Sequence, residues 1–163
     1  MTTFVTALEA VHDVRSFNCG NEVLNTWVQQ IAKQHKKNLI SQTFVIVHED
    51  KPQVVLGFYS LAIRALISRD TLPPSMAKKL PANVPAITLG RLAVEESQQG
   101  RGYGEELLLD AMSRAKSAAE AVGGWALFVD AKDEKAAAFY LRYGFVAMPS
   151  NPLSLLIPIA HIP

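Results

Sequence analysis

The sequence predicts an α+β fold in which helices flank a mixed, mostly antiparallel sheet. Two β-rich runs, residues 42–48 and 53–63, are separated by turn-forming residues, which predicts an antiparallel hairpin. Later in the chain, an apolar strand, a glycine-rich loop, an amphipathic helix and a second apolar strand predict one parallel strand pair with a right-handed crossover. The length of 163 residues and the 49% hydrophobic fraction suit a single domain over residues 1–163.

The N-terminal part is expected to contain one strand and one helix. Residues 2–8 alternate as a strand does, and residues 18–21 supply turn and cap residues before a helical period begins. The apolar stripe of this helix consists of Leu24, Trp27, Val28 and Ile31. Its polar side is expected to carry Gln29, Lys33, Lys36 and Lys37.

The rest of the chain is expected to alternate between strands and helices. Four prolines make residues 70–85 a loop with at most a short helix over residues 75–80. A strand ending at Val94, a helix running from Glu105 to Val122 and a strand over residues 125–130 follow. Asp133 is a predicted N-cap for a helix that runs to Tyr143, and residues 145–148 and 153–159 form a closing strand pair.

The glycine-rich loop joins the central strand to the long helix. Gly100, Gly102 and Gly104 alternate there, so the backbone can approach a ligand closely. The helix that follows directs unpaired N–H groups and the positive end of its dipole at the loop, which favours a phosphate or pyrophosphate. A glycine-rich turn can also be only a tight connection. The loop has neither the Gly-Lys-Ser/Thr of a P-loop nor the full spacing of a dinucleotide fold, so another phosphate-bearing cofactor is required.

Two motifs resemble those of one known superfamily. Gln99-x-x-Gly102-x-Gly104 after a strand is similar to the pyrophosphate motif of the GNAT acetyltransferases, and residues 136–145 resemble that family's second signature. Residues 17–20 before the first helix, and residues 89–94, are similar to one branch in particular. That branch consists of the toxins of bacterial toxin-antitoxin pairs that acetylate aminoacyl-tRNA.

The resemblance implies a GNAT fold, with about four helices and a splayed parallel strand pair, and acetyl-CoA as the cofactor. The splayed strand would pair with pantetheine through the backbone of Leu92, Ala93 and Val94. The pyrophosphate would lie against Gln99, Gly100, Arg101, Gly102, Tyr103 and Gly104. Tyr140 is implied as the general acid that protonates the departing thiolate. Asp133 stands where many relatives carry Asn, which weakens any direct cofactor contact at that position.

Charge is unevenly distributed along the sequence. From Val23 to Val94 there are nine basic residues and three acidic ones, although the whole chain carries a net charge of only +1. A polyanionic partner such as tRNA is one interpretation, and a solvated helix face is the alternative for the lysines. The candidates for phosphate contact are Lys33, Lys36, Lys37, Arg64, Lys78, Lys79 and Arg91.

The sequence predicts no metal site and singles out no general base. The four histidines form no cluster, and Glu95 and Glu96 can be merely solvated. A base is dispensable if the acceptor is an α-amine, which titrates near about 7.7 to 8.0 and is already partly neutral at physiological pH. Cys19, the single cysteine, excludes an internal disulfide and suits a reducing compartment.

Three functions remain open from the sequence. The first is a toxin that acetylates the α-amine of aminoacyl-tRNA, and the second is an acetyltransferase for a small amine or a protein N-terminus. The third is an idle domain that binds acetyl-CoA or a protein, against which the intact Tyr140 and glycine loop argue. The basic middle favours the toxin, and the resemblance further implies a homodimer and a ribbon-helix-helix antitoxin. With no signal sequence or membrane span in evidence, we expect a bacterial cytoplasmic protein.

Overall fold

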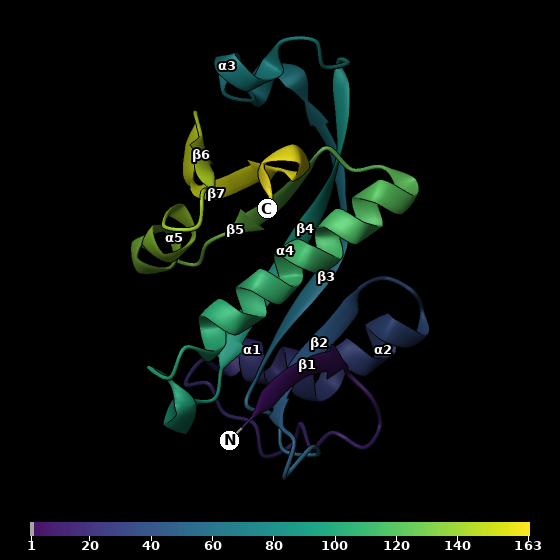
Figure 1. The fold of residues 1–163 in the computed structure, drawn as a ribbon, viewed down its shortest axis with the longest axis vertical. Helices are drawn as coiled ribbons and strands as arrows, with labels where there is room; N and C mark the ends of the chain where they lie inside the picture. The colour runs from purple at the N-terminus through teal and green to yellow at the C-terminus, as the bar shows by residue number, and fades with distance from the viewer. Residues whose placement is uncertain (1) are drawn as a thin grey trace. The chain divides into compact units, whose positions relative to one another are not determined.

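A computed structural model describes residues 2–163 of the chain (Figure 1). Its strands are β1 (Thr3–Ala7), β2 (Gln42–His48), β3 (Gly57–Ser68), β4 (Asn83–Val94), β5 (Ala126–Asp130), β6 (Val146–Met148) and β7 (Asn151–Pro158). Its α-helices are α1 (Glu22–Thr26), α2 (Ala32–Lys37), α3 (Pro74–Ala77), α4 (Tyr103–Val122) and α5 (Glu134–Leu141). A π-helix, η1 (Trp27–Ile31), links α1 to α2, and three short 3-10 helices are η2 (Arg69–Thr71), η3 (Glu96–Gln98) and η4 (Ile159–His161).

The strands form one seven-stranded sheet in the order β1-β2-β3-β4-β5-β7-β6. The pairs β1–β2, β2–β3, β5–β7 and β6–β7 are antiparallel. Strands β4 and β5 are parallel, with Ala86 opposite Ala126 and Leu89 opposite Val129. The predicted mostly antiparallel sheet with one parallel pair is therefore confirmed, as is the hairpin of β2 and β3.

The chain divides into two compact units, each with its own apolar core. The first unit contains the residues up to Ala62 together with Gly90–Ala111, and the second contains Ile63–Leu89 and Met112–Pro163. In the first core, the Phe58 ring lies 5.4 Å from Phe17 and 6.0 Å from Trp27, centroid to centroid. The second core consists of Leu72, Val84, Ala86, Ala126, Phe128 and Leu156.

The N-terminal helix is less regular than its sequence predicts. Asn21 caps α1 as expected, since its side chain accepts a hydrogen bond from the Leu24 N–H at 3.2 Å. The expected single helix is interrupted by five residues of π-helix, in which the Ala32 N–H bonds the Trp27 carbonyl five residues earlier. Two consecutive side chains, Trp27 and Val28, are buried in this segment. Periodicity alone could not predict the π-helix, because such segments are rare and form where tertiary packing demands them.

Several strand boundaries in the middle of the chain differ from prediction, and β3 runs to Ser68 where residue 63 is the predicted end. Strand β3 begins at Gly57, because residues 51–54 form a turn in which the Val54 N–H bonds the Lys51 carbonyl at 3.1 Å. Strand β4 begins at Asn83 and therefore contains Pro85, whose carbonyl accepts the Trp125 N–H at 2.8 Å. The predicted helix over residues 75–80 is reduced to α3, which starts with Pro74 at its first position.

The C-terminal elements follow the predicted order. Helix α4 ends at Val122, and the next residue, Gly123, has a φ of +94°, which lies in the left-handed region. Asp133 caps α5 by accepting the Ala136 N–H at 2.8 Å, and this helix ends at Leu141, two residues before the predicted end. No helix within residues 2–163 has the length and apolarity needed to cross a bilayer.

Candidate active site

The glycine-rich loop forms an open backbone surface in front of α4. Gly100 and Gly102 have φ angles of +80° and +85°, which favour glycine. A Cβ atom built on either residue meets no atom within 4 Å, so the backbone there is accessible to a ligand. The Glu106 N–H bonds the Gly102 carbonyl at 3.1 Å, so α4 begins directly at the loop and the positive end of its dipole lies there. This geometry fits a phosphate group.

Side chains of the loop and of the first turn of α4 are partly held by β1 and β2. The Thr3 hydroxyl lies 2.8 and 3.0 Å from the two carboxylate oxygens of Glu106. The Tyr103 ring packs edge-on against His48, with ring centroids 6.0 Å apart. Arg101 is exposed on the loop. The end of the loop that leads into α4 is therefore anchored to β1 and β2, and the loop exposes the Arg101 cation.

Gln99 ties the start of the loop to two neighbouring segments. Its side-chain N–H group donates to the Val94 carbonyl at 3.1 Å and to the Cys19 carbonyl at 3.3 Å. The side-chain N–H group of this exposed residue thus already has partners within the chain. Gln99 can serve a ligand site by holding the loop in place.

The end of β4 extends past its parallel partner. Pairing with β5 covers Ala86 to Leu89, and β4 continues for five residues to Val94. Ala93 is buried, and a Cβ atom on Gly57 of β3 would lie only 2.8 Å from the Ala93 carbonyl oxygen. Gly57 thus allows close backbone packing beneath this end of β4. The strand end is positioned firmly, and it leads through η3 into the glycine loop.

Tyr140 is buried in the second unit. Its side chain is 7% exposed, and its ring packs edge-on against Phe139 and Phe145 with centroids 5.2 and 5.6 Å apart. Burial raises the pKa of the Tyr140 phenol above its ordinary value. The phenol is therefore protonated at physiological pH, as a proton donor must be.

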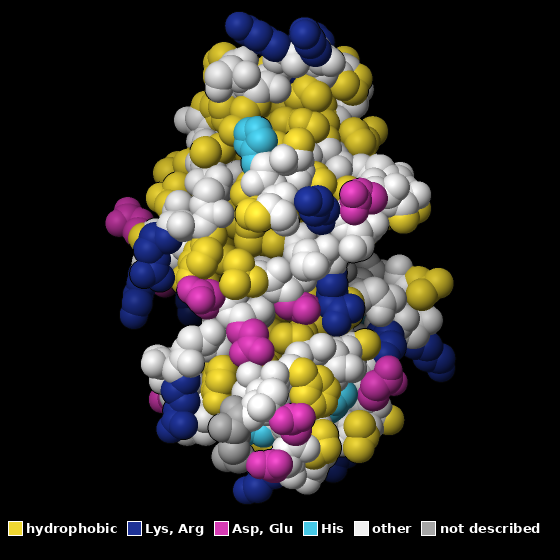
Figure 2. All heavy atoms as spheres, in the orientation of Figure 1, with side chains coloured by type: hydrophobic (Ala, Val, Ile, Leu, Met, Phe, Trp, Pro, Cys, Tyr) yellow, Lys and Arg dark blue, Asp and Glu magenta, His cyan; other side chains and the backbone are white. Residues whose placement is uncertain are grey.

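The seven residues predicted to contact tRNA differ in the exposure of their side chains and in their partners within the chain. Lys33 and Lys37 are exposed on α2, and Lys78 and Lys79 are exposed just after α3. Figure 2 shows basic side chains protruding over the end of the molecule at which Figure 1 draws α3. Lys36 Nζ lies 3.2 Å from the Glu9 carboxylate and 2.5 Å from the Leu8 carbonyl oxygen. The four exposed lysines are the better candidates for a polyanion.

Both arginines of that set also have partners within the chain. Arg64 donates to Asp130 at 3.0 and 3.1 Å, and these hydrogen bonds lower the pKa of the Asp130 carboxyl. The Arg91 guanidinium lies 4.2 Å from the centroid of the Trp27 ring, and its burial lowers the pKa of the guanidinium. Charge patterning along a sequence cannot identify these partners, because they are distant in the chain.

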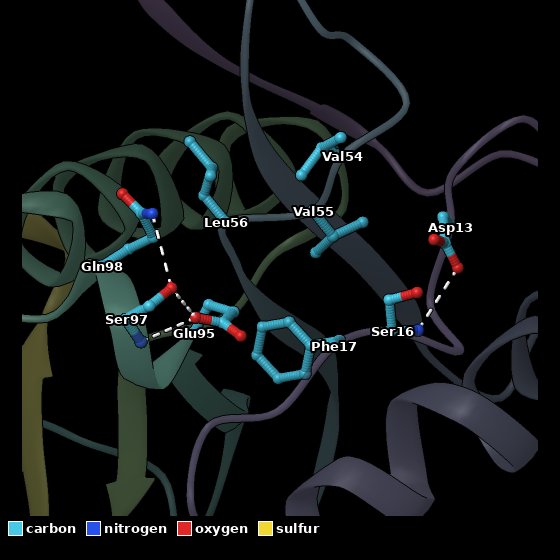
Figure 3. Close-up of a pocket in the computed structure, with 9 residues that line it drawn as sticks. All are labelled: Asp13, Ser16, Phe17, Val54, Val55, Leu56, Glu95, Ser97 and Gln98. Carbon is cyan, nitrogen blue, oxygen red and sulfur yellow. Dashed lines mark hydrogen bonds between the residues drawn. The ribbon is translucent and has the colours of Figure 1, made fainter.

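A small surface hollow of about 170 Å³ lies in the first unit, and the sequence did not predict it (Figure 3). The Glu95 carboxylate accepts the Ser97 N–H at 2.7 Å, and Asp13 accepts the Ser16 N–H at 3.3 Å. Both carboxylates are thus already bonded within their own turns. The lining residues are Asp13, Ser16, Phe17, Val54, Val55, Leu56, Glu95, Ser97 and Gln98.

The predicted site residues fall into both units. All nine residues predicted to bind the cofactor lie in the first unit, as do Lys33, Lys36, Lys37 and Arg91. Tyr140 lies in the second unit with Arg64, Lys78 and Lys79. Within residues 2–163 there is no group of three His, Cys, Asp or Glu side chains that could hold a metal ion.

Comparison with known proteins identifies relatives over nearly the whole chain. Residues 40–147 match the family described as acetyltransferase (GNAT) domain. A protein of Mycobacterium tuberculosis (strain ATCC 25618 / H37Rv) named tRNA-acetylating toxin is 36% identical over 145 residues, which are 89% of this chain and 85% of the relative.

Two solved structures are similar in fold and sequence. AtaT complexed with acetyl-methionyl-tRNAfMet has a TM-score of 0.90 and 35% identity, covering 99% of this chain and 97% of that chain. A mutant AtaT toxin bound to the C-terminus of the antitoxin AtaR and acetyl-CoA has a TM-score of 0.83 and 31% identity, covering 98% and 95%.

Proposed function

Because this chain belongs to the GNAT acetyltransferase family, we propose that it transfers an acetyl group from acetyl-CoA to the α-amino group of aminoacyl-tRNA and so blocks translation. The observation that carries this proposal is the 36% identity, over most of both chains, to a protein named tRNA-acetylating toxin. The likeness to AtaT, solved with acetyl-methionyl-tRNA, supports the same acceptor class.

In this proposal the residues from Gln99 to Gly104 hold the pyrophosphate of acetyl-CoA. The open backbone at Gly100 and Gly102 and the N-terminal end of α4, where the helix dipole is positive, suit two phosphates. The backbone of Leu92, Ala93 and Val94, beyond the end of the β5 pairing, is proposed to pair with pantetheine. When bound, acetyl-CoA supplies an activated thioester, so this chain must mainly position the reactants.

Tyr140 is proposed as the proton donor. Its raised pKa keeps the phenolic proton in place until a base forms beside it. An ordinary thiol has a pKa of about 8.5, below that of a phenol, so Tyr140 would stabilise a developing thiolate mainly by donating a hydrogen bond. The proton that the acceptor amine loses on acylation would replace any proton that the phenol gives up. A backbone N–H at the end of β4 would stabilise the developing oxyanion.

The acceptor is proposed to bind through exposed lysines. The exposed side chains that can contact phosphates directly are those of Lys33, Lys37, Lys78 and Lys79. The other three candidates, Lys36, Arg64 and Arg91, would have to give up a contact within the chain or attract the phosphates electrostatically from a distance. An α-amine needs no dedicated base, because part of it is neutral near physiological pH.

The assembly and location of the protein are also part of the proposal. We infer that residues 1–163 form one catalytic domain, since the family match at residues 40–147 includes parts of both units. A ribbon-helix-helix antitoxin is the proposed partner, supported by the likeness to AtaT bound to the antitoxin AtaR. A homodimer in the bacterial cytoplasm, where acetyl-CoA and charged tRNA occur, completes the proposal.

The test is the transfer of labelled acetyl groups from acetyl-CoA to charged tRNA. We expect label on the α-amine of at least one aminoacyl-tRNA and none on uncharged tRNA. Preferential labelling of polyamines or N-terminal peptides would instead support the alternative, an acetyltransferase for a small amine or a protein N-terminus.

A further inference from the structure

The buried side-chain amide of Asn25, on α1, bonds the loop of residues 18–20 that precedes this helix. Asn25 is only 4% exposed, and its side-chain oxygen accepts the Cys19 N–H at 2.9 Å. Its side-chain N–H group donates to the Asn18 side-chain oxygen, also at 2.9 Å. The Asn18 oxygen in turn accepts the Gly20 N–H at 2.9 Å. One amide thus fixes the conformation of residues 18–20 by acting as donor and acceptor at once.

Residues 18–20 hold the segment that precedes the glycine loop. The Asn18 carbonyl accepts the Glu96 N–H at 2.7 Å, and the Cys19 carbonyl accepts the side-chain N–H of Gln99 at 3.3 Å. Both bonds join residues that are about 80 positions apart in the sequence. The second bond ends at Gln99, immediately before Gly100, whose positive φ opens the backbone to a ligand.

We propose that Asn25 is a positioning residue for the cofactor loop, acting through Asn18, Cys19 and Gln99. The inference rests on the proposed binding of acetyl-CoA by residues 99–104. Glycines make that loop conformationally free, so ordering it on binding costs entropy unless the protein orders it beforehand. The side-chain amide of Asn25 holds residues 18 and 19, and these residues in turn hold the start of the loop, so Asn25 orders the loop without contacting the cofactor.

The experiment compares acetyl-CoA affinity in a double-mutant cycle of Asn25→Leu and Gln99→Leu. Leucine has the same branching and number of side-chain heavy atoms as asparagine but cannot bond Cys19 or Asn18. We expect each single variant to bind acetyl-CoA about tenfold more weakly, and the double variant to be about as weak as either single one, because both changes break one path. For Asn25→Leu the KM for acetyl-CoA should rise, with kcat at saturation within about twofold of the unaltered protein.

Thr43→Val is the matched control in the same unit. Thr43 is 1% exposed, and its buried hydroxyl has no hydrogen-bond partner among the described residues. This variant also replaces a buried polar group with an apolar one, and it should leave acetyl-CoA affinity unchanged. If Asn25→Leu fails to fold, Asn25→Asp serves in its place. It keeps the acceptor for Cys19 but sets two acceptors opposite each other at Asn18, so a smaller loss of affinity is expected.

The outcomes separate this inference from the proposed function. A lower melting temperature with unchanged affinity in the Asn25 variants, or independent additive losses in the cycle, would overturn the positioning role alone. Failure of the unaltered protein to bind acetyl-CoA would overturn the proposed function and this inference with it. A shared, non-additive loss of affinity in the cycle supports both.

Discussion

Gly102→Glu tests the cofactor site most sharply, because it adds charge to the loop without a steric clash. A Cβ atom at Gly102 meets nothing within 4 Å, so the glutamate side chain fits in space. The φ of +85° imposes a backbone cost of about 1–2 kcal/mol on any non-glycine residue. For a chain of this length that cost lowers the melting temperature by about 2 to 8 °C.

The loss of binding should be much larger than the loss of stability. A carboxylate about 5 Å from one phosphate charge is repelled by about 3 kcal/mol at an effective dielectric constant of about 20. This energy corresponds to an affinity about 200-fold lower for acetyl-CoA. Isothermal titration calorimetry measures it directly.

Gly123→Glu is the matched control. Gly123, at the other end of α4, also has a positive φ, of +94°, and no atom within 4 Å of a built Cβ. The two variants therefore share the added charge and the backbone strain, and only Gly102→Glu should lose acetyl-CoA. Equal affinities in the two variants would refute the assignment of the loop as the pyrophosphate site.

Three further predictions concern chemistry, acceptor binding and stability. Tyr140→Phe should keep the fold and the acetyl-CoA affinity but lower kcat by about 10² to 10⁴-fold, since only the proton donor is lost; steady-state kinetics at saturating acetyl-CoA measures this, and an unchanged kcat would leave Tyr140 a packing residue. Lys33→Ala with Lys37→Ala should flatten the log-log salt dependence of charged-tRNA binding by up to about two units, and an unaltered slope would remove α2 from the interface. Hydrogen bonds from Arg64 lower the pKa of Asp130, so the pair stabilises the fold above the unfolded pKa of about 3.9 and loses this contribution as pH falls below it. Asp130→Asn should therefore lose less thermal stability than the unaltered protein between pH 7 and pH 3, as measured by thermal unfolding, and an equal loss would contradict that linkage.

Local signals in the sequence predicted much of the framework. The positive φ of Gly102, the Asp133 cap of α5 and the stop of α4 at Gly123 all depend on a few neighbouring residues. Such features are set by backbone sterics and local hydrogen bonds, which a sequence displays directly. The strand, loop and helix that form the proposed pyrophosphate site can therefore be predicted from the sequence.

Long-range partners could not be predicted in this way. Lys36 resembled Lys33 as a free surface charge, yet it pairs with Glu9, 27 positions earlier in the chain. Arg91 lies over Trp27, and that ring belongs to a π-helix that periodicity did not reveal. The sequence does not distinguish Asn25, because an isolated asparagine in a helical pattern carries no signal until its buried partners are known.

Acetyl transfer to the α-amine of aminoacyl-tRNA is tested most directly by one measurement. The purified protein and labelled acetyl-CoA would be presented with a panel of aminoacyl-tRNAs, free amino acids, polyamines and N-terminal peptides across a salt series. We predict label on the α-amine of charged tRNA, with a rate at low substrate that falls steeply as salt rises, because phosphate contacts release counterions. Faster acetylation of a peptide or polyamine than of every charged tRNA would contradict the claim.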